Sequence, residues 1–204
     1  MNTVQLVIEI LGTFAFAISG IRWAAYKNFD WFGGYVVGLA TAIGGGTIRD
    51  VMLGVTPFWM TNPLYMICTA GALLTVIIFK KAIVRFTNTW FLFDTLGLGL
   101  FTVAGLQKTL FDGFPFWVAI IMGCITGAAG GVIRDVLINE IPLIFRKEIY
   151  AMACILGGVA YYICYEVDLN VEITAIVCFL IVVAVRLMAV KWHISLPHLH
   201  GENQ

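Results

Sequence analysis

Charged residues are scarce in this chain: only 12% of its 204 residues carry a charge, where a typical soluble domain has about 25%. Hydrophobic residues make up 61% of the sequence, and the mean hydropathy is +0.95. A core of this size cannot bury so many apolar side chains, so lipid must cover much of the surface. The shortage of charge therefore excludes a soluble domain and predicts an integral membrane protein.

Other absences narrow the possible functions. The 12 basic and 12 acidic residues cancel, so there is no positive excess for binding nucleic acid. The five cysteines lie in apolar stretches without metal-ligand spacing, and the three histidines fall within the last 12 residues without partners at a fixed spacing. No set of nucleophile and base stands out. We expect no metal, no cofactor, no nucleic-acid partner and no enzymatic activity.

Apolar runs of membrane-spanning length are abundant. The core of a bilayer takes about 20 apolar residues of helix. Charges, prolines and tryptophans delimit seven candidate spans, and all six tryptophans fall at or near the span ends, as in an aromatic belt. The spans are residues 3–21, 32–53, 63–80, 89–107, 115–138, 148–165 and 171–190. We predict an all-α integral membrane protein, a single transmembrane domain over residues 1–204.

The basic residues predict how these spans are oriented. If the odd-numbered connections and the C-terminus share one side, nine of the 12 basic residues fall there. The nine are Arg22, Lys27, Lys80, Lys81, Arg85, Arg146, Lys147, Arg186 and Lys191. Only Lys108 lies on the opposite side, while Arg49 and Arg134 lie within spans. Because basic connections stay in the cytoplasm, we expect the C-terminus inside and the N-terminus outside.

The sequence also contains a duplication. Residues 44–51 read GGGTIRDV and residues 129–136 read AGGVIRDV, which places the two motifs 85 residues apart. The same shift aligns Glu9 with Asp94. The first repeat covers about 4–82 and the second about 89–167, with 171–190 left over as a seventh helix. Because each repeat has three spans, an odd number, the second enters the membrane from the opposite face, and we predict two inverted repeats.

The glycines of the motifs allow two interpretations. Small residues let membrane helices approach closely, and they also weaken a helix enough to bend or break it. We favour a bend or break in the second and fifth spans, because an ionisable pair follows directly and freed backbone groups would line a watery path. The positions concerned are Gly44, Gly45, Gly46, Ala129, Gly130 and Gly131, with Thr41 and Thr126 on the wall of the path.

The charged residues of the repeats predict ion pairs. Residues i and i+1 of a helix do not face each other, so Arg49 is not expected to pair with Asp50. Depth in the membrane instead selects the pairs Glu9–Arg49 and Asp94–Arg134. Asp50 and Asp135 are then expected to face elsewhere. We therefore expect two charged clusters, each near one mouth of a central passage. One contains Glu9, Arg49 and Asp50, and the other contains Asp94, Arg134 and Asp135.

Two copies of this motif in seven short-looped spans resemble the bacterial branch of the trimeric intracellular cation channels, a family that also carries a glycine-transporter domain name. The resemblance covers about residues 4–190. It implies a homotrimer in the prokaryotic cytoplasmic (inner) membrane, with one pore in each protomer. Kinked second and fifth spans would line that pore and pass monovalent cations such as potassium. Small residues at Gly71, Gly97 and Gly99 would let adjacent protomers approach.

Three functions fit these features. The first is a cation channel for potassium or sodium. The second is a secondary carrier for glycine or another small zwitterion, in which Arg49 or Arg134 would hold the substrate carboxylate. The third is a structural membrane protein, which leaves the duplicated glycines and arginines unexplained. We favour the channel, with membrane lipid, the cations and further copies of the chain as partners.

Overall fold

The computed structural model describes residues 3–79, 89–145 and 149–194, which form helices joined by short connections and contain no strand. The elements are α1 (Thr3–Tyr26), α2 (Trp31–Met52), α3 (Phe58–Thr61), α4 (Leu64–Ile78), α6 (Thr89–Phe111), α7 (Phe116–Leu137), the 3-10 helix η1 (Leu143–Phe145), α8 (Ala151–Glu166) and α9 (Val171–Lys191). The prediction of an all-helical protein is confirmed. Several predicted basic positions, Lys80, Lys81, Arg85, Arg146 and Lys147, lie outside the described residues, as do His198 and His200.

Five of the described helices are long and apolar enough to cross a membrane. They are Val4–Tyr26, Trp31–Met52, Thr89–Phe111, Phe116–Leu137 and Val171–Lys191. The helices at the third and sixth predicted spans, α4 and α8, have 15 and 16 residues. The count of seven spans therefore stays a prediction.

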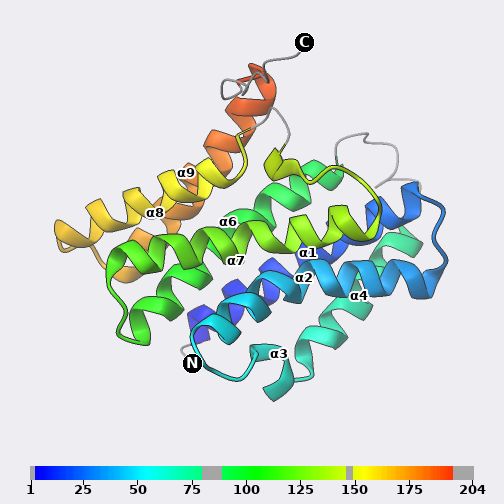
Figure 1. Ribbon diagram of the computed structural model, residues 1–204, viewed down its shortest axis with the longest axis horizontal. Helices are drawn as coiled ribbons and strands as arrows, with labels where there is room; N and C mark the ends of the chain where they lie inside the picture. Colours follow the sequence, from blue (N-terminus) through cyan, green and yellow to red (C-terminus); the bar gives the residue numbers. More distant parts are fainter. Residues whose placement is uncertain (1–2, 80–88, 146–148, 195–204) are drawn as a thin grey trace, which may run out of the picture.

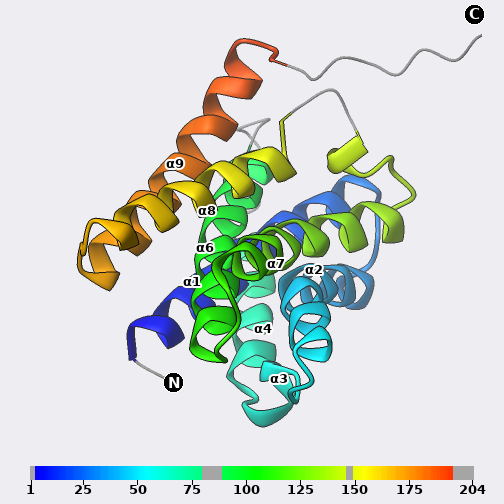
Figure 2. The same ribbon diagram turned by 60° about the vertical axis from the view of Figure 1, so that its left-hand side comes forward.

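Four long helices form the centre of the molecule. α1 packs against α2 and α6, and α7 packs against α2 and α6. Figures 1 and 2 show α3 and α4 on one side of this group and α8 and α9 together on the other. α4 contacts α1 and α2, whereas α8 and α9 contact α7 and α6. The two motifs, residues 44–51 and 129–136, lie on the central helices α2 and α7.

The glycines of the two motifs mark the place where α2 crosses α7. Both helices are uninterrupted through them, from Trp31 to Met52 and from Phe116 to Leu137. A β-carbon at Gly45 would overlap the carbonyl oxygen of Thr126, and one at Gly130 would overlap that of Thr41. The predicted break in the helices is wrong, because both helices continue through the glycines. The glycines instead let the two backbones approach closely. A bend that keeps the helical hydrogen bonds stays a prediction.

A second set of reciprocal contacts joins α1 to α6. The ring of Phe16 lies against Gly97, and the ring of Phe101 lies against Gly12, with the two ring centroids 5.3 Å apart. Gly97 therefore serves packing within the chain rather than between protomers, as does Gly99, which lies against Phe179. The corresponding part of the trimer prediction is wrong for these two glycines. Gly71, by contrast, has nothing within 4 Å of where its β-carbon would be.

Candidate functional site

The first charged cluster, which we call the Arg49 cluster, forms at the end of α2. Arg49 Nε donates to Asp50 Oδ1 over 2.8 Å, and both side chains are almost completely buried. Lys108 Nζ, from the last turn of α6, donates to the same carboxylate oxygen over 2.8 Å. The Arg49 guanidinium also lies 5.7 Å from the ring centroid of Phe58. The cluster thus joins the two repeats through Lys108 and Asp50.

Glu9 belongs to the same cluster but contacts a different residue from the one predicted. Its Oε2 accepts a hydrogen bond from the hydroxyl of Tyr65 over 2.5 Å, and the side chain is 1% exposed. Within the described residues, Glu9 and Arg49 form no ion pair. The predicted Glu9–Arg49 pair is therefore wrong, because α4 places the Tyr65 hydroxyl directly on the carboxylate while Asp50 takes the arginine.

The Arg134 cluster is the counterpart at the end of α7. Arg134 Nη1 donates to Asp94 Oδ1, so the predicted Asp94–Arg134 pair is confirmed. The same nitrogen donates to Ser19 Oγ over 2.7 Å, and Nε donates to Asp135 Oδ1 over 2.9 Å. The Tyr150 hydroxyl lies 3.5 Å from Asp94 Oδ1. Arg134 is fully buried among these groups.

In both clusters the arginine binds the aspartate that follows it in the chain. The expectation that Asp50 and Asp135 would face elsewhere is wrong, although the local backbone is helical. The rule that neighbours face apart describes where the β-carbons point. The arginine stem is long enough for Nε to turn sideways and reach the next carboxylate, so a helical turn and this pair are compatible.

The second oxygen of each aspartate holds a backbone amide eight residues further on. Asp50 Oδ2 accepts from the Phe58 amide over 2.8 Å, and Asp135 Oδ2 accepts from the Leu143 amide over 2.9 Å. Each amide comes from the short helix or 3-10 turn that follows the motif helix. The carboxylates therefore attach both connectors to the charged clusters, and they do so in equivalent ways.

Each cluster gains a second cation that the motifs do not contain. Lys108 supplies it for the Arg49 cluster. At the Arg134 cluster, the buried Arg186 of α9 lies 4.9 Å from the ring centroid of Tyr150 and donates to the Ile149 carbonyl over 2.8 Å. Two carboxylates and two cations thus gather at each end. Balanced, hydrogen-bonded charge is the form in which ionisable groups are tolerated inside a membrane protein.

Sequence reasoning missed several members of these clusters. They are Ser19, Tyr65, Lys108, Tyr150 and Arg186. The tyrosines had a signal, because the 85-residue shift that aligns the motifs also aligns Tyr65 with Tyr150. Lys108 and Arg186 have no counterparts under that shift, and only the packing of α6 and α9 brings them to the clusters.

Some buried polar atoms of the clusters lack a hydrogen-bond partner among the described residues. They are Arg49 Nη2, Arg134 Nη2 and Asp94 Oδ2. Buried polar atoms are nearly always satisfied by protein or by ordered water. These three atoms are therefore places where ordered water would complete the hydrogen bonding of the clusters.

Removing the Tyr65 hydroxyl should destabilise the protein more than removing that of Tyr150. Tyr65→Phe leaves the buried Glu9 carboxylate without its donor, at a cost of about 1–3 kcal/mol. Tyr150→Phe should cost less, because its hydroxyl lies 3.5 Å from Asp94, at the limit of a hydrogen bond. Phenylalanine keeps both aromatic rings, so each variant tests the hydroxyl alone. Unfolding in detergent micelles would measure the two losses, and equal losses would contradict the assignment.

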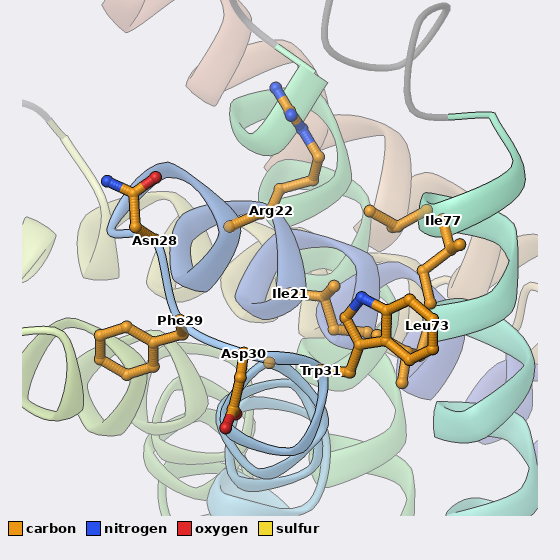
Figure 3. A pocket seen from close by; sticks show the side chains of 11 residues that line it. Ile21, Arg22, Asn28, Phe29, Asp30, Trp31, Leu73 and Ile77 are labelled. Atoms are coloured by element: carbon orange, nitrogen blue, oxygen red, sulfur yellow. The ribbon is translucent and has the colours of Figure 1, made fainter.

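A separate hollow of about 290 Å³ lies where the end of α1 and the start of α2 meet α4. In Figure 3, Trp31 stands beside Leu73, and the polar ends of Arg22, Asn28 and Asp30 point away from one another. Polar groups that diverge cannot hold one ligand together. The charged clusters, rather than this hollow, are the candidate functional site.

These features define a class: an all-helical membrane protein with two equivalent clusters of buried ionisable residues inside the bundle. A family model described as Glycine transporter matches the chain twice, over residues 6–81 and 91–166. The inner membrane protein YadS of Escherichia coli K12 is 38% identical over 195 residues, which cover 93% of each chain. A membrane protein of Vibrio cholerae is 40% identical over 197 residues, covering 94% of this chain and 81% of that one.

Solved structures of cation channels are also similar to this chain. The TRIC trimeric intracellular cation channel orthologue of Rhodobacter sphaeroides superposes with a TM-score of 0.89 at 32% identity, covering 95% of this chain and all of that one. A prokaryotic TRIC channel in 0.5 M KCl superposes with a TM-score of 0.86 at 31% identity and covers 96% of this chain. The chain belongs to the bacterial branch of the trimeric intracellular cation channel family.

Proposed function

We propose that this protein is a cation channel that passes monovalent cations, potassium or sodium, along a path through each protomer between α2 and α7. The observation that carries the proposal is the pair of buried charged clusters on either side of the Gly45–Gly130 crossing. Each arginine follows its crossing glycine by four residues, about 6 Å of helix. Kinship with solved cation channels supports the choice of a cation.

The contacts at the crossing support the inverted arrangement of the two repeats. Gly45 lies against Thr126, and Gly130 lies against Thr41, so the two helices run antiparallel past each other. An antiparallel crossing of equivalent helices is what a two-fold axis in the membrane plane produces. The repeats would then present the Arg49 cluster to one face of the membrane and the Arg134 cluster to the other.

In the described arrangement the crossing is too tight for an ion, because the backbones are in contact there. Conduction requires α2 and α7 to separate or bend at Gly44–Gly46 and Ala129–Gly131. Thr41 and Thr126 are buried, and each hydroxyl donates to the carbonyl four residues before it. When the helices part, these oxygens would line the opening together with the freed carbonyls and would suit a partly hydrated cation.

A carrier of glycine is the less favoured function. A carrier for a zwitterion needs a cation free to hold the substrate carboxylate. Arg49 is bound to Asp50, and Arg134 is bound to both Asp94 and Asp135. Lys108 is likewise bound to Asp50. These three cations are therefore occupied by the protein's own carboxylates.

The remaining parts of the proposal are a homotrimer in a prokaryotic inner membrane with the C-terminus in the cytoplasm. The trimer and the membrane are supported by the descriptions of the TRIC and YadS relatives. The orientation is supported by the distribution of basic residues along the sequence.

Purified protein in planar bilayers under a potassium gradient tests the function. We expect discrete unitary currents that reverse near the potassium equilibrium potential. Saturable glycine uptake into vesicles without such currents would select the carrier and refute the channel. Protein with both Asp94 and Arg134 replaced, reconstituted at the same density, serves as the control for leak around the protein.

A further inference from the structure

A groove outside the charged clusters opens between α1, α6 and α9. α6 packs against both α1 and α9, so it forms the floor between them. Two adjoining hollows make up the groove, one of about 260 Å³ and one of about 400 Å³, and Val4 and Glu172 line both. The groove lies at the end of the bundle where α1 and α9 begin and α6 ends.

The lining of the groove changes from polar to apolar along the helices. The first hollow contains Gln5, Gln107 and Glu172, close to the helix ends. The second contains only apolar side chains besides Glu172, including Ile176 and Phe179. From Glu172 to Phe179 the groove follows α9 for about 10 Å into the membrane-spanning segment. A polar entrance above an apolar slot of this depth matches a lipid headgroup above an acyl chain.

The charge at the entrance indicates which headgroup fits. Glu172 is the only charged residue among those that line the two hollows. Its place in the first turn of α9 suits the helix dipole, but the dipole does not explain why it borders the groove. Lys108, the lysine that the described residues place at this end, is bound to Asp50. The entrance thus attracts an ammonium group, and no cationic side chain among its lining residues pairs with a purely anionic headgroup.

We propose that this groove binds a membrane lipid with a primary ammonium headgroup, such as phosphatidylethanolamine. The ammonium pairs with the Glu172 carboxylate, the side-chain amides of Gln5 and Gln107 face the phosphate region, and one acyl chain occupies the slot beside Ile176 and Phe179. The lipid would tie α9 to the central helices α1 and α6. This inference is independent of ion conduction, because it concerns a surface on the side of the bundle away from α2.

Native mass spectrometry of the delipidated protein tests it. The protein in detergent is mixed with equal amounts of phosphatidylethanolamine and phosphatidylglycerol, and the bound lipids are counted per protomer. Wild-type protein should retain more phosphatidylethanolamine. Glu172→Gln should reduce that preference about threefold, the size expected for a partly exposed ion pair. Glu166→Gln, which changes an exposed carboxylate outside the groove, should leave the preference unchanged.

A second variant tests the slot itself. Ile176 is 57% exposed, so Ile176→Trp fills the apolar hollow without entering the core and should lower the binding of both lipids. Added phosphatidylethanolamine should raise the unfolding midpoint of wild-type protein more than that of Glu172→Gln, when each is compared with its own midpoint without lipid. An unchanged preference in Glu172→Gln, or unchanged lipid counts in Ile176→Trp, would overturn the proposal. So would efficient cross-linking of Ile176→Cys between protomers, which would show that a second copy covers the groove.

Discussion

Replacing Arg134 with methionine is expected to destabilise the protein by about 3–5 kcal/mol, the cost of breaking a buried ion pair by removing one partner. The guanidinium holds Asp94, Asp135 and Ser19 together in a fully buried position. Without it, two buried carboxylates remain close together and lose the charge that balances them, although the Leu143 amide and the Tyr150 hydroxyl remain as donors. The protein should still insert, but its unfolding in detergent micelles should occur at much lower denaturant concentration.

The double variant Arg134→Met with Asp94→Leu should lose less stability than the two single losses added together. Each single variant leaves one buried charge of the pair without its partner, and the double variant removes both charges of the pair. The remaining Asp135 keeps its hydrogen bond from the Leu143 amide. Couplings between polar side chains in membrane proteins run at about 0.6–2 kcal/mol, so a difference of this size is measurable. Strictly additive losses would mean that Asp94 and Arg134 act independently.

Lys27 provides a matched control for the effect of burial. Its Nζ lies 2.7 Å from Glu140 Oε1, but both side chains are about a third exposed. Removing such a pair costs about 0–1 kcal/mol, because water solvates the partner that remains. Lys27→Met should therefore be close to neutral under the conditions in which Arg134→Met is strongly destabilising. A similar loss in both variants would show that burial is not the cause.

Alanine at Gly45 or Gly130 is expected to reduce both stability and ion flux. Each β-carbon would overlap a backbone carbonyl of the facing helix, which a rotamer change cannot relieve. Overpacking of this kind costs about 1–3 kcal/mol, and more where backbone has to move. Because α2 and α7 would be forced apart at the crossing, the path that we propose between them should change shape, and unitary currents should be reduced or lost.

Gly71→Ala is the control for the loss of a glycine as such. Gly71 lies within α4 with open space around it, so alanine meets no other group of the same chain there. Helix propensity alone favours alanine over glycine by about 1 kcal/mol. This variant should be as stable as wild type or slightly more stable, with unchanged currents. Normal currents from both Gly45→Ala and Gly130→Ala would remove the crossing from the conduction mechanism.

The sequence by itself determined the class of protein and the helices that carry its site. So large an excess of apolar residues is stable only where lipid covers the surface. In lipid, apolar runs of this length form helices, because a helix pairs the backbone N–H and C=O groups within the run itself. The 85-residue duplication located both motifs, and the family match over 6–81 and 91–166 has the same spacing. Charged residues placed within apolar runs identified both clusters, because burial of such residues is costly wherever it occurs.

The tertiary structure decided which groups pair and what the glycines do. The sequence estimates only how deep each residue lies in the membrane. Depth alone predicted the Asp94–Arg134 pair correctly. It failed for Glu9, which binds Tyr65 of α4 instead of Arg49 of α2. Lys108 and Arg186 enter the clusters only because α6 and α9 bring them there. A glycine in a helix permits either a bend or a close neighbour, since both require the absence of a side chain. Only the position of the facing helix distinguishes the two, and at Gly45 that helix is in contact.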